Sequence, residues 1–527
     1  MVGGLTTRVA RAAPGEDLVV THTGGIPKKR TIVRFPVVGT VSRATVHNND
    51  LPNVLRGLRE RVYAVEGPGG LRCPPRPARG LFNDRLGDDR RSLLMHLRGC
   101  QPITSSKFLE HYKGAKRAIY ERAVSENLAG GVPRWSAYLN TFVKAEFLNL
   151  DAKPDPAPRV IQPRHPRYNA ALGRYIQPLE HRAYRAIAKI CGGPTVMKGY
   201  NAAQVGRIMA SAWGEFNSPC GVSLDASRFD QHVSVEALQF EHSIYRGAYS
   251  NLTTHEKDEL ALLLEWQISN RGIARLPEAT VKYTVDGNRM SGDMNTALGN
   301  CLLMCLMVRS WCRRQGVRFR LMDNGDDATV FMEAADLPLF MDGLKQWFQE
   351  MGFTMKVEEP VFTLEHVEFC QTHPVRVGGE WRMVRNPLIA MAKDTLWKCP
   401  NRGSQLAAWR WLTAVGDCGA AACSGVPVMQ EFYAYLQSHN TRGPTQGFGS
   451  GDSGFERMAV GMCRTRQPVD DNARVSFWLA FGITPDTQVQ LERHFRGMAP
   501  QQPCRQWIED DTLNLSHIPV DAPNHLL

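Results

Sequence analysis

Apolar positions along the chain recur at helical spacing in some stretches and alternate in others. Residues 105–127 and 169–190 have the apolar spacing of helices. Residues 297–308 are almost entirely apolar, which is typical of a buried helix and is far short of the ~18 to 20 residues that span a bilayer. Residues 221–224 alternate as a short strand does, and two apolar stretches flank the Asn-Gly pair at 324–325, which predicts a hairpin. The middle third therefore predicts an α+β class.

Glycine and proline mark the places where this pattern stops. Residues 1–100 are rich in Gly, Pro and Arg, which predicts short elements joined by long crossing loops. Repeated prolines in residues 151–167 oppose helix and favour an extended backbone. After about residue 387 the pattern is mostly helical, and the Gly/Ser-rich residues 447–454 predict a mobile loop. We find no internal repeat.

Composition narrows the possible partners. The 63 Lys and Arg residues outnumber the 52 Asp and Glu residues, and the net charge of +11 favours a polyanion, either nucleic acid or an anionic membrane face. The 13 cysteines form no CxxC pair and no ladder with histidine at zinc spacing, so disulfides are not implied. The first 20 residues lack an apolar core of signal-peptide length, which predicts action in the cytosol.

Carboxylates end the predicted strand and occupy the predicted hairpin. Asp225 ends the strand and Asp230 follows in the same stretch, while Asp326 and Asp327 lie at the hairpin tip. Adjacent carboxylates repel each other, and hard oxygen ligands suit Mg²⁺ or Mn²⁺ rather than zinc. A lone Gly-Asp-Asp is as readily a conformational turn, and a lone strand-end aspartate is more often a cap. Their combination is what two-metal nucleotidyl transfer requires.

Three ordered motifs resemble those of a known enzyme family. The sequences GVSLDASRFDQH (221–232), GNRMSGDMNTALGN (287–300) and NGDD (324–327) resemble motifs A, B and C of RNA-dependent RNA polymerases from positive-strand RNA plant viruses of the tombusvirus and umbravirus type. Further similar segments are FVKAE (142–146), RVIQPR (159–164), MGFTMK (351–356) and VEFCQ (367–371). The resemblance covers roughly residues 140–400, and the flanks match more loosely.

The resemblance implies a right-hand polymerase with fingers, a palm built on an antiparallel sheet with helices, and a mostly helical thumb. On this reading residues 1–170 form the N-terminal region and fingers, residues 171–390 form the palm with an inserted fingers segment, and residues 391–527 form the thumb and C-terminal tail. The implied activity is RNA-directed RNA synthesis from ribonucleoside triphosphates, with release of pyrophosphate.

The resemblance also implies roles for individual residues. Two Mg²⁺ or Mn²⁺ ions would be held by the catalytic residues Asp225, Asp326 and Asp327, with Asp326 the stronger candidate of the pair. Lys356 would protonate the departing pyrophosphate as a general acid, although a surface lysine is nearly as good a reading. The residues implied for the ribose 2′-hydroxyl are Asp230, Ser291, Thr296 and Asn300; Ser291 also reads as an ordinary helix cap.

Basic residues before the first motif resemble the fingers strand that covers the incoming nucleotide. Arg159 would bind the triphosphate, because an arginine fork matches phosphate oxygens. Lys144 and Arg164 are weaker candidates, and Glu146 could pair with one of them. A solvated basic face is the alternative for this segment. Trp409 and Trp411, near Arg402 and Arg410, would either stack on a base or an initiating nucleotide, or belong to the core.

Other functions fit the motifs less well. Reverse transcriptases typically carry a Tyr-x-Asp-Asp turn, which the DNGDD sequence at 323–327 lacks, and no GxxxxGK[ST] loop supports a helicase. A basic RNA-binding or movement protein leaves the motif order unexplained. The expected partners are template and nascent RNA, ribonucleoside triphosphates, other viral replicase proteins and host factors. We expect the host cytoplasm, with membrane association in replication complexes either peripheral or through a partner.

Overall fold

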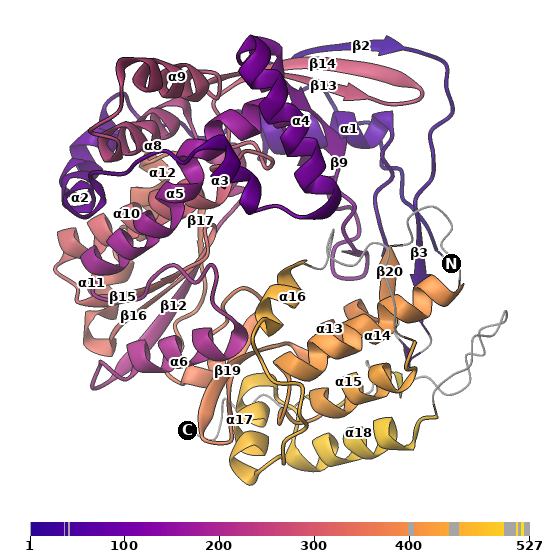
Figure 1. Ribbon diagram of the computed structural model, residues 1–527. Helices are drawn as coiled ribbons and strands as arrows, with labels where there is room; N and C mark the ends of the chain where they lie inside the picture. The colour runs from indigo at the N-terminus through magenta and orange to yellow at the C-terminus, as the bar shows by residue number, and fades with distance from the viewer. Residues whose placement is uncertain are drawn as a thin grey trace.

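A four-stranded antiparallel sheet at the lower left of Figure 1 carries the motif aspartates. The computed structural model describes residues 2–35, 37–39, 43–398, 405–441, 453–499, 513–514 and 518–520. The strand order is β15 (Phe319–Asp323), β16 (Asp327–Glu333), β12 (Pro219–Ala226) and β17 (Met355–Val357). The predicted strand and hairpin are therefore confirmed. Gly325 has φ 107°, a backbone conformation that only glycine adopts without strain. This requirement explains why a glycine occupies the turn.

Alternating side chains of this sheet enter two different cores. Val222 and Val330 face α10 (Thr296–Gln315), whose Leu302 belongs to the same apolar cluster. On the other face, Phe331 packs with Met209 of α6 (Ala202–Trp213). Neighbouring residues of a strand point to opposite faces, and here both faces are covered. Apolar residues are therefore needed at successive positions, and the strands are almost continuously apolar in sequence.

Helices surround α10, whose apolar sequence is explained by burial on all sides. Its neighbours are α2 (Leu81–Leu97), α5 (Pro166–Ile190), α8 (Val235–Ala248), α11 (Leu337–Met341) and α12 (Leu344–Glu350), and α9 (Thr254–Glu265) packs in turn on α5 and α8. Gly316, with φ 69°, ends α10 in a left-handed cap. The helices predicted over 169–190 and 297–308 are confirmed. Mixed helix and sheet confirm the α+β class. No helix among the described residues has both the length and the apolarity to cross a membrane.

The single helix predicted over residues 105–127 is wrong, because the chain forms two helices there. These are α3 (Ser105–Glu110) and α4 (Gly114–Gly130), and Gly114 has φ 56° between them. The break brings Phe108 of α3 against Tyr120 of α4, with ring centroids 5.2 Å apart in an edge contact. Burial of both rings in one cluster offsets the backbone hydrogen bonds that a continuous helix would have kept.

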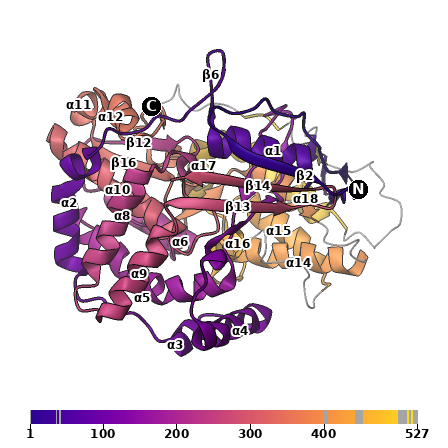
Figure 2. The ribbon, with the colours of Figure 1, turned by 90° about the horizontal axis from the view of Figure 1, so that it is seen from above.

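The N-terminal residues belong to a second sheet. Its order is β2 (Asp17–His22), β14 (Ala279–Asp286), β13 (Ser269–Arg275) and β8 (Leu139–Asn140), and Figure 2 shows β2, β14 and β13 side by side. One face of this sheet packs against α1 (Leu51–Leu58) and the π-helix η1 (Arg59–Tyr63).

After β2 the chain crosses the molecule. β3 (Thr31–Arg34) pairs with β1 (Val2–Gly3) on one side and with β20 (Leu396–Lys398) on the other. Figure 1 shows this indigo segment running from the upper sheet down to the C-terminal helices. Residues 2–35 thus contact both the upper sheet and the C-terminal part of the chain.

The C-terminal part is mostly helical, as predicted. It contains the hairpin β18 (Thr372–Val377) and β19 (Glu380–Arg385), followed by α13 (Pro387–Asp394), α14 (Gln405–Ala422), α15 (Met429–Ser438), α16 (Ser453–Ala459), α17 (Asp471–Phe481) and α18 (Pro485–Gly497). Trp409 and Trp411 are 3% and 2% exposed, so they are core residues and not a surface for stacking nucleotides. Arg402 and residues 447–452 of the predicted mobile loop lie outside the described residues, and Ser453 and Gly454 begin α16.

Candidate active site

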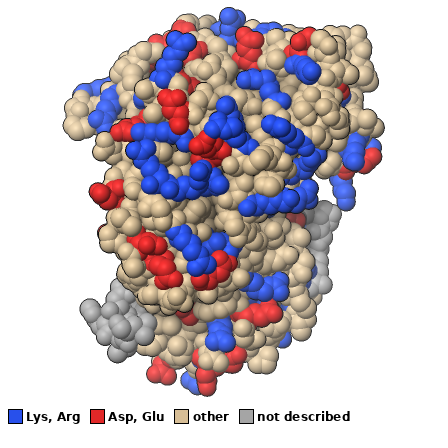
Figure 3. Space-filling view, turned by 90° about the vertical axis from the view of Figure 1, so that its left-hand side faces the viewer, with Lys and Arg blue, Asp and Glu red and all other residues tan. Residues whose placement is uncertain are grey.

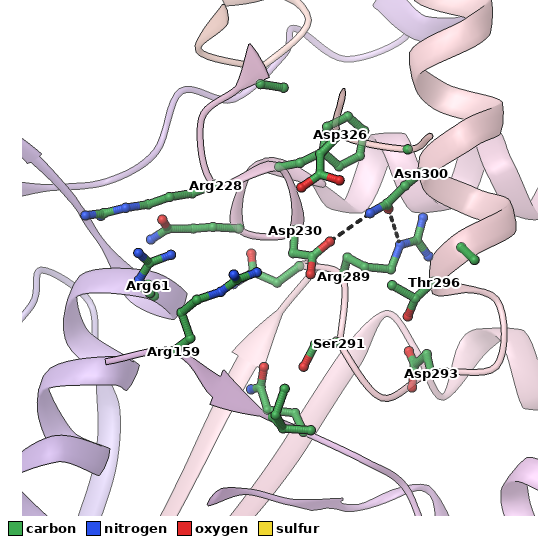
Figure 4. Close-up of a pocket in the computed structure, with 18 of the residues that line it drawn as sticks. Arg61, Arg159, Arg228, Asp230, Arg289, Ser291, Asp293, Thr296, Asn300 and Asp326 are labelled. Atoms are coloured by element: carbon green, nitrogen blue, oxygen red, sulfur yellow. Dashed lines mark hydrogen bonds between the residues drawn. The ribbon is translucent and has the colours of Figure 1, made fainter. Parts of the chain in front are cut away.

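A cavity of about 660 Å³ lies where β12 ends, between the central sheet and the N-terminal part of the chain. Its walls come from segments that are distant in sequence, which include the turn after β12, the hairpin turn at residues 324–326, the loop before α10, residues 159–162 and the π-helix η1 (Figure 4). Most of the residues predicted for the site line it: Lys144, Arg159, Asp225, Asp230, Ser291, Thr296, Asn300 and Asp326.

The three predicted metal ligands lie together because of strand register. Asp225 of β12 is the direct partner of Asp327 on β16 and of Lys356 on β17. The Lys356 Nζ atom lies 3.2 Å from Asp225 Oδ2, so Lys356 pairs with the carboxylate instead of standing apart from it. Asp326 lines the cavity, while Asp327 lies behind it next to Cys370.

Repulsion within this acidic group is strong. Burial, followed by the charges of Asp326 and then Asp225, raises the pKa of Asp327 to about 6. In the described part of the chain, no group of three or more His, Cys, Asp or Glu side chains is already arranged to hold a metal ion. The donor set nevertheless fits a hard divalent cation, because three carboxylates share one sheet edge and a cation would relieve their repulsion.

A buried polar network connects the first motif to the second. Asn300 Nδ2 donates to Asp230 Oδ1 at 2.9 Å, and Arg289 Nε donates to Asn300 Oδ1 at 3.0 Å. Arg289 in turn forms a fully buried ion pair with Glu241 of α8. Burial raises the pKa of Asp230. Asn300 is thereby held in one orientation, with its amide nitrogen directed at Asp230 (Figure 4).

The loop before α10 is fixed against residues 160–164. Ser291 Oγ donates to the Val160 carbonyl at 3.3 Å. A Cβ atom on Gly292 would come within 2.5 Å of the Pro163 Cα atom, so no larger residue fits there. Thr296 Oγ1 donates to the Met290 carbonyl at 2.7 Å. The loop is therefore a rigid wall of the cavity.

Arg164 is the one predicted nucleotide-binding residue that does not line the cavity. Its side chain is 1% exposed and pairs with Asp293, with Nε 2.5 Å from Oδ1. The same guanidinium donates to the Ala137 carbonyl at 2.7 Å and to Asn270 at 2.7 Å. These partners occupy its donors, so Arg164 holds the loop in place from behind.

Four basic residues face the cavity from the side opposite Asn300, and sequence reasoning identified only two of them. Lys144 and Arg159 were predicted, and both lie within 3.4 Å of Glu146. The pairing of Glu146 with Lys144 was expected as one of two possibilities, whereas its pairing with Arg159 was not. Arg61 and Arg228 were missed (Figure 4). Arg228 lies inside the DASRFD motif, but Arg61 comes from η1, which no sequence signal connects to the site.

Three arginines, Arg61, Arg159 and Arg228, line the same cavity. Burial, then Arg228 and Arg159, lowers the pKa of Arg61 to about 10. Such a group attracts anions, and Lys and Arg side chains also gather across one face of the molecule (Figure 3). The cavity therefore has an acidic wall for cations and a basic wall for phosphate groups.

Lys198 and Asp323 are two further residues that sequence reasoning missed, and both act on the hairpin turn. Lys198 Nζ donates to the Asn324 carbonyl at 2.8 Å. Asp323 Oδ2 accepts from the Gly325 amide at 3.2 Å, and its Oδ1 has no hydrogen-bond partner in the described part of the chain. Asp323 is fully buried beside the thiols of Cys301 and Cys305, and burial raises its pKa to about 8.

The buried carboxyl group of Asp323 makes stability depend on pH. The folded chain keeps this proton up to about pH 8, whereas the unfolded chain loses it near the ordinary value of 3.8. The free energy of unfolding should therefore fall as pH rises between these values, by up to about 1.4 kcal/mol per pH unit. The Asp323→Asn variant has no such proton to lose. Its free energy of unfolding should therefore rise relative to that of the wild type by up to about 1.4 kcal/mol for each unit of increasing pH.

Urea denaturation of both proteins at pH 5.5, 6.5 and 7.5 measures this difference. The exposed Asp342→Asn is the matched control and should give a difference that stays constant with pH. A constant difference for Asp323→Asn as well would mean that Asp323 is ionised in the folded chain.

Comparisons with known proteins agree with this geometry. Residues 18–502 match the family described as viral RNA dependent RNA polymerase, which extends well beyond the 140–400 range expected from the motifs. The RNA-directed RNA polymerase of Tobacco necrosis virus (strain A) is 44% identical over 501 residues, covering 93% of this chain and 67% of that protein. The RNA-directed RNA polymerase of Turnip crinkle virus is 43% identical over 477 residues, covering 89% and 60%.

A third relative matches a smaller share of its own length. The RNA-directed RNA polymerase of Maize chlorotic mottle virus is 44% identical over 476 residues, covering 90% of this chain and 49% of that protein. The chain thus spans between about half and two thirds of the length of these three relatives. The motif order, the aspartates on one sheet edge and a family match over nearly the whole sequence all agree. The chain therefore belongs to the viral RNA-dependent RNA polymerases.

Proposed function

We propose that this chain copies single-stranded RNA from ribonucleoside triphosphates. In this reaction the 3′-hydroxyl of the growing strand attacks the α-phosphorus, a phosphodiester bond forms, and pyrophosphate leaves. The observation that carries the proposal is the composition of the cavity, which is lined both by the carboxylates of Asp225 and Asp326 and by the guanidinium of Arg159. A nucleoside triphosphate with its metal ions needs both kinds of wall at once.

Asp225, Asp326 and Asp327 would hold the divalent ions, which we propose to be two Mg²⁺ or Mn²⁺. When bound, such ions increase the nucleophilicity of the attacking hydroxyl and stabilise charge on the leaving oxygen. Lys356 would donate a proton to the pyrophosphate. Its side chain is 65% exposed, and a cation on Asp225 would release its ammonium group from the present ion pair.

The triphosphate would be bound by Arg159 and Lys144, with Arg61 and Arg228 beside them. A guanidinium offers two parallel donors to phosphate oxygens. Phosphate binding would also relieve the mutual repulsion of these side chains. We propose that Arg164 supports this site through Asp293 without contacting the nucleotide.

Asp230 and Asn300 would recognise the ribose 2′-hydroxyl, with Ser291 and Thr296 on the neighbouring loop. Asn300→Ala or Asp230→Ala should lower the preference for ribonucleotides over deoxyribonucleotides by about ten- to hundredfold, the scale of one hydrogen bond to a charged group. Competitive incorporation of UTP and dUTP measures this preference. Asn217→Ala, at the opposite end of β12, is the control, and an unchanged ratio in both site variants would remove these roles.

The architecture would be that of a right hand. We propose that residues 1–170 provide the N-terminal region and fingers, residues 171–390 the palm with an inserted fingers segment, and residues 391–527 the thumb and C-terminal tail. The central sheet with α10 and α8 would be the palm. The contact of β3 with β20 would link the N-terminal region to the thumb.

Template RNA and the nascent strand would be the macromolecular ligands, with other viral replicase proteins and host factors as partners. The site of action would be replication complexes in the host cytoplasm, with membrane association peripheral or through a partner. The net charge of +11 suits both RNA and an anionic membrane surface.

The proposal is tested by incorporation of labelled ribonucleotides by the purified protein on a single-stranded RNA, with Mg²⁺ or Mn²⁺. We expect a product whose composition follows the template, so a poly(C) template should incorporate only GTP. Chelation of the metal should stop synthesis. Incorporation that ignores the template would indicate a terminal nucleotidyltransferase instead.

A further inference from the structure

An exposed tryptophan lies outside the cavity and has no role in the functions considered so far. Trp135 belongs to the short 3₁₀ helix η2 (Arg134–Ala137) and is 49% exposed. A side chain of this size gains free energy from burial, so leaving half of it in water costs stability. An exposed large aromatic side chain is therefore a better indicator of a binding site than a single exposed aliphatic side chain.

Trp135 is held in a fixed position. The His165 ring contacts it edge-on with centroids 4.9 Å apart, and the Arg167 guanidinium lies 5.7 Å from the centre of the indole ring. The backbone supports the same geometry, because the His165 amide donates to the Ser136 carbonyl at 3.0 Å. The indole is therefore a rigid platform with a large part of its surface open to solvent.

The surroundings of this platform are basic. Arg134 is exposed, and its guanidinium lies 5.2 Å from the centre of the Trp266 ring. Arg122 and Arg167 both act on His165, and Glu126 is the carboxylate that faces this group, 3.8 Å from Arg167. Three arginines against one carboxylate favour a polyanion over an acidic or neutral protein segment.

A short stretch of chain joins the platform to the wall of the active-site cavity. Val160, Ile161 and Gln162 line the cavity, and the same extended segment reaches His165 beside Trp135. At ~3.3 Å per extended residue, the stretch from 162 to 165 spans about 10 Å. Asp293 of the cavity wall joins this stretch through Arg164. A strand leaving the cavity along this segment would meet the indole within a few nucleotides.

We propose that Trp135 stacks on an unpaired base of single-stranded RNA outside the catalytic cavity, with the exposed Arg134 contacting an adjacent phosphate. Arg167 supports the indole instead, because its guanidinium already donates to Asn127 Oδ1 at 2.9 Å and to the Glu126 carbonyl at 3.2 Å. This inference rests on the proposed function and assigns a further binding site to it. An aromatic face with flanking guanidinium groups binds bases without regard to sequence, since every base has a π-face. A strand that is copied in full needs contacts of this kind.

The test compares two fluorescent RNAs of equal length and charge, one ordinary and one with abasic riboses, binding to the full chain. Trp135→Ala should weaken binding of the ordinary RNA by about 5- to 150-fold, the range for one stacked base, and leave the abasic RNA unchanged. Trp135→Phe should recover most of the affinity because it keeps a ring. Phe362→Ala, which removes a 60% exposed aromatic elsewhere, is the control.

Equal affinities of wild type and Trp135→Ala for the ordinary RNA would overturn the proposal, and so would an equal loss for both RNAs. If Trp135→Ala fails to fold, Trp135→Phe and Arg134→Gln still decide it, because Arg134→Gln should weaken the binding of both RNAs. The binding assay involves no nucleotide addition. Its failure is therefore separate from failure of RNA synthesis, which the incorporation assay reports.

Discussion

Asp326→Ala and Asp225→Ala are each expected to remove detectable nucleotide incorporation while leaving RNA binding largely intact. Loss of one well-placed electrostatic group in an active site lowers kcat by about 10²- to 10³-fold, and a metal ligand acts on both the nucleophile and the leaving group. Asp225 lies on β12 opposite Asp327, and Asp326 lies in the hairpin turn directly before Asp327, so the sheet fixes the positions of all three carboxylates. A neighbouring carboxylate therefore cannot move in to replace the lost one.

The measurement is single-nucleotide extension of a labelled primer on an RNA template over a range of Mg²⁺ concentrations, with RNA affinity measured in parallel. Asp342→Ala, which removes one exposed carboxylate away from the cavity, is the control for net charge and should extend the primer normally. Extension by either site variant within about tenfold of the wild-type rate would contradict the two-metal assignment. Recovery at high Mg²⁺ would show that the lost group bound the metal weakly.

The acidic half of the site was predictable from the sequence for a physical reason. Asp225 ends one apolar run, and Asp326 lies in a turn between two others. Strands that are buried on both faces pair in the core, so their ends meet at one edge and bring the carboxylates together. The Asn-Gly turn signal predicts the hairpin of β15 and β16, in which Asp323 pairs with Ala328. The register of Asp327 opposite Asp225 depends instead on the pairing of β16 with β12.

The basic half was only partly predictable, because its members depend on packing between distant segments. Arg61 reaches the cavity from the π-helix η1, and its approach depends on how that segment packs on the second sheet. Arg164 has the sequence context of a phosphate ligand but lies behind the loop, paired with Asp293. Periodicity and charge counts contain no information on which side of a loop an arginine faces.

Arg289→Met is expected to destabilise the folded chain by about 3–5 kcal/mol, the effect of leaving a buried charge without its partner. Glu241 is fully buried, and the Arg289 guanidinium keeps its pKa below the ordinary value. Without that guanidinium, the carboxylate stays unpaired in the core or takes up a proton. Urea denaturation at pH 7 gives the change in the free energy of unfolding. The control is Arg246→Met, at an exposed position on the same helix as Glu241. It should change the free energy of unfolding by less than about 0.5 kcal/mol.

The double variant Arg289→Met/Glu241→Gln separates charge from packing. Glutamine keeps an acceptor for Asn295 Nδ2, which lies 2.9 Å from Glu241 Oε1, but it carries no charge. If the unpaired carboxylate causes the loss, the double variant should recover at least about half of the stability that Arg289→Met loses. A double variant no more stable than Arg289→Met would attribute the loss to packing alone. In both variants Asn300 lacks the Arg289 donor that orients it, so ribose selection should weaken even where stability is recovered.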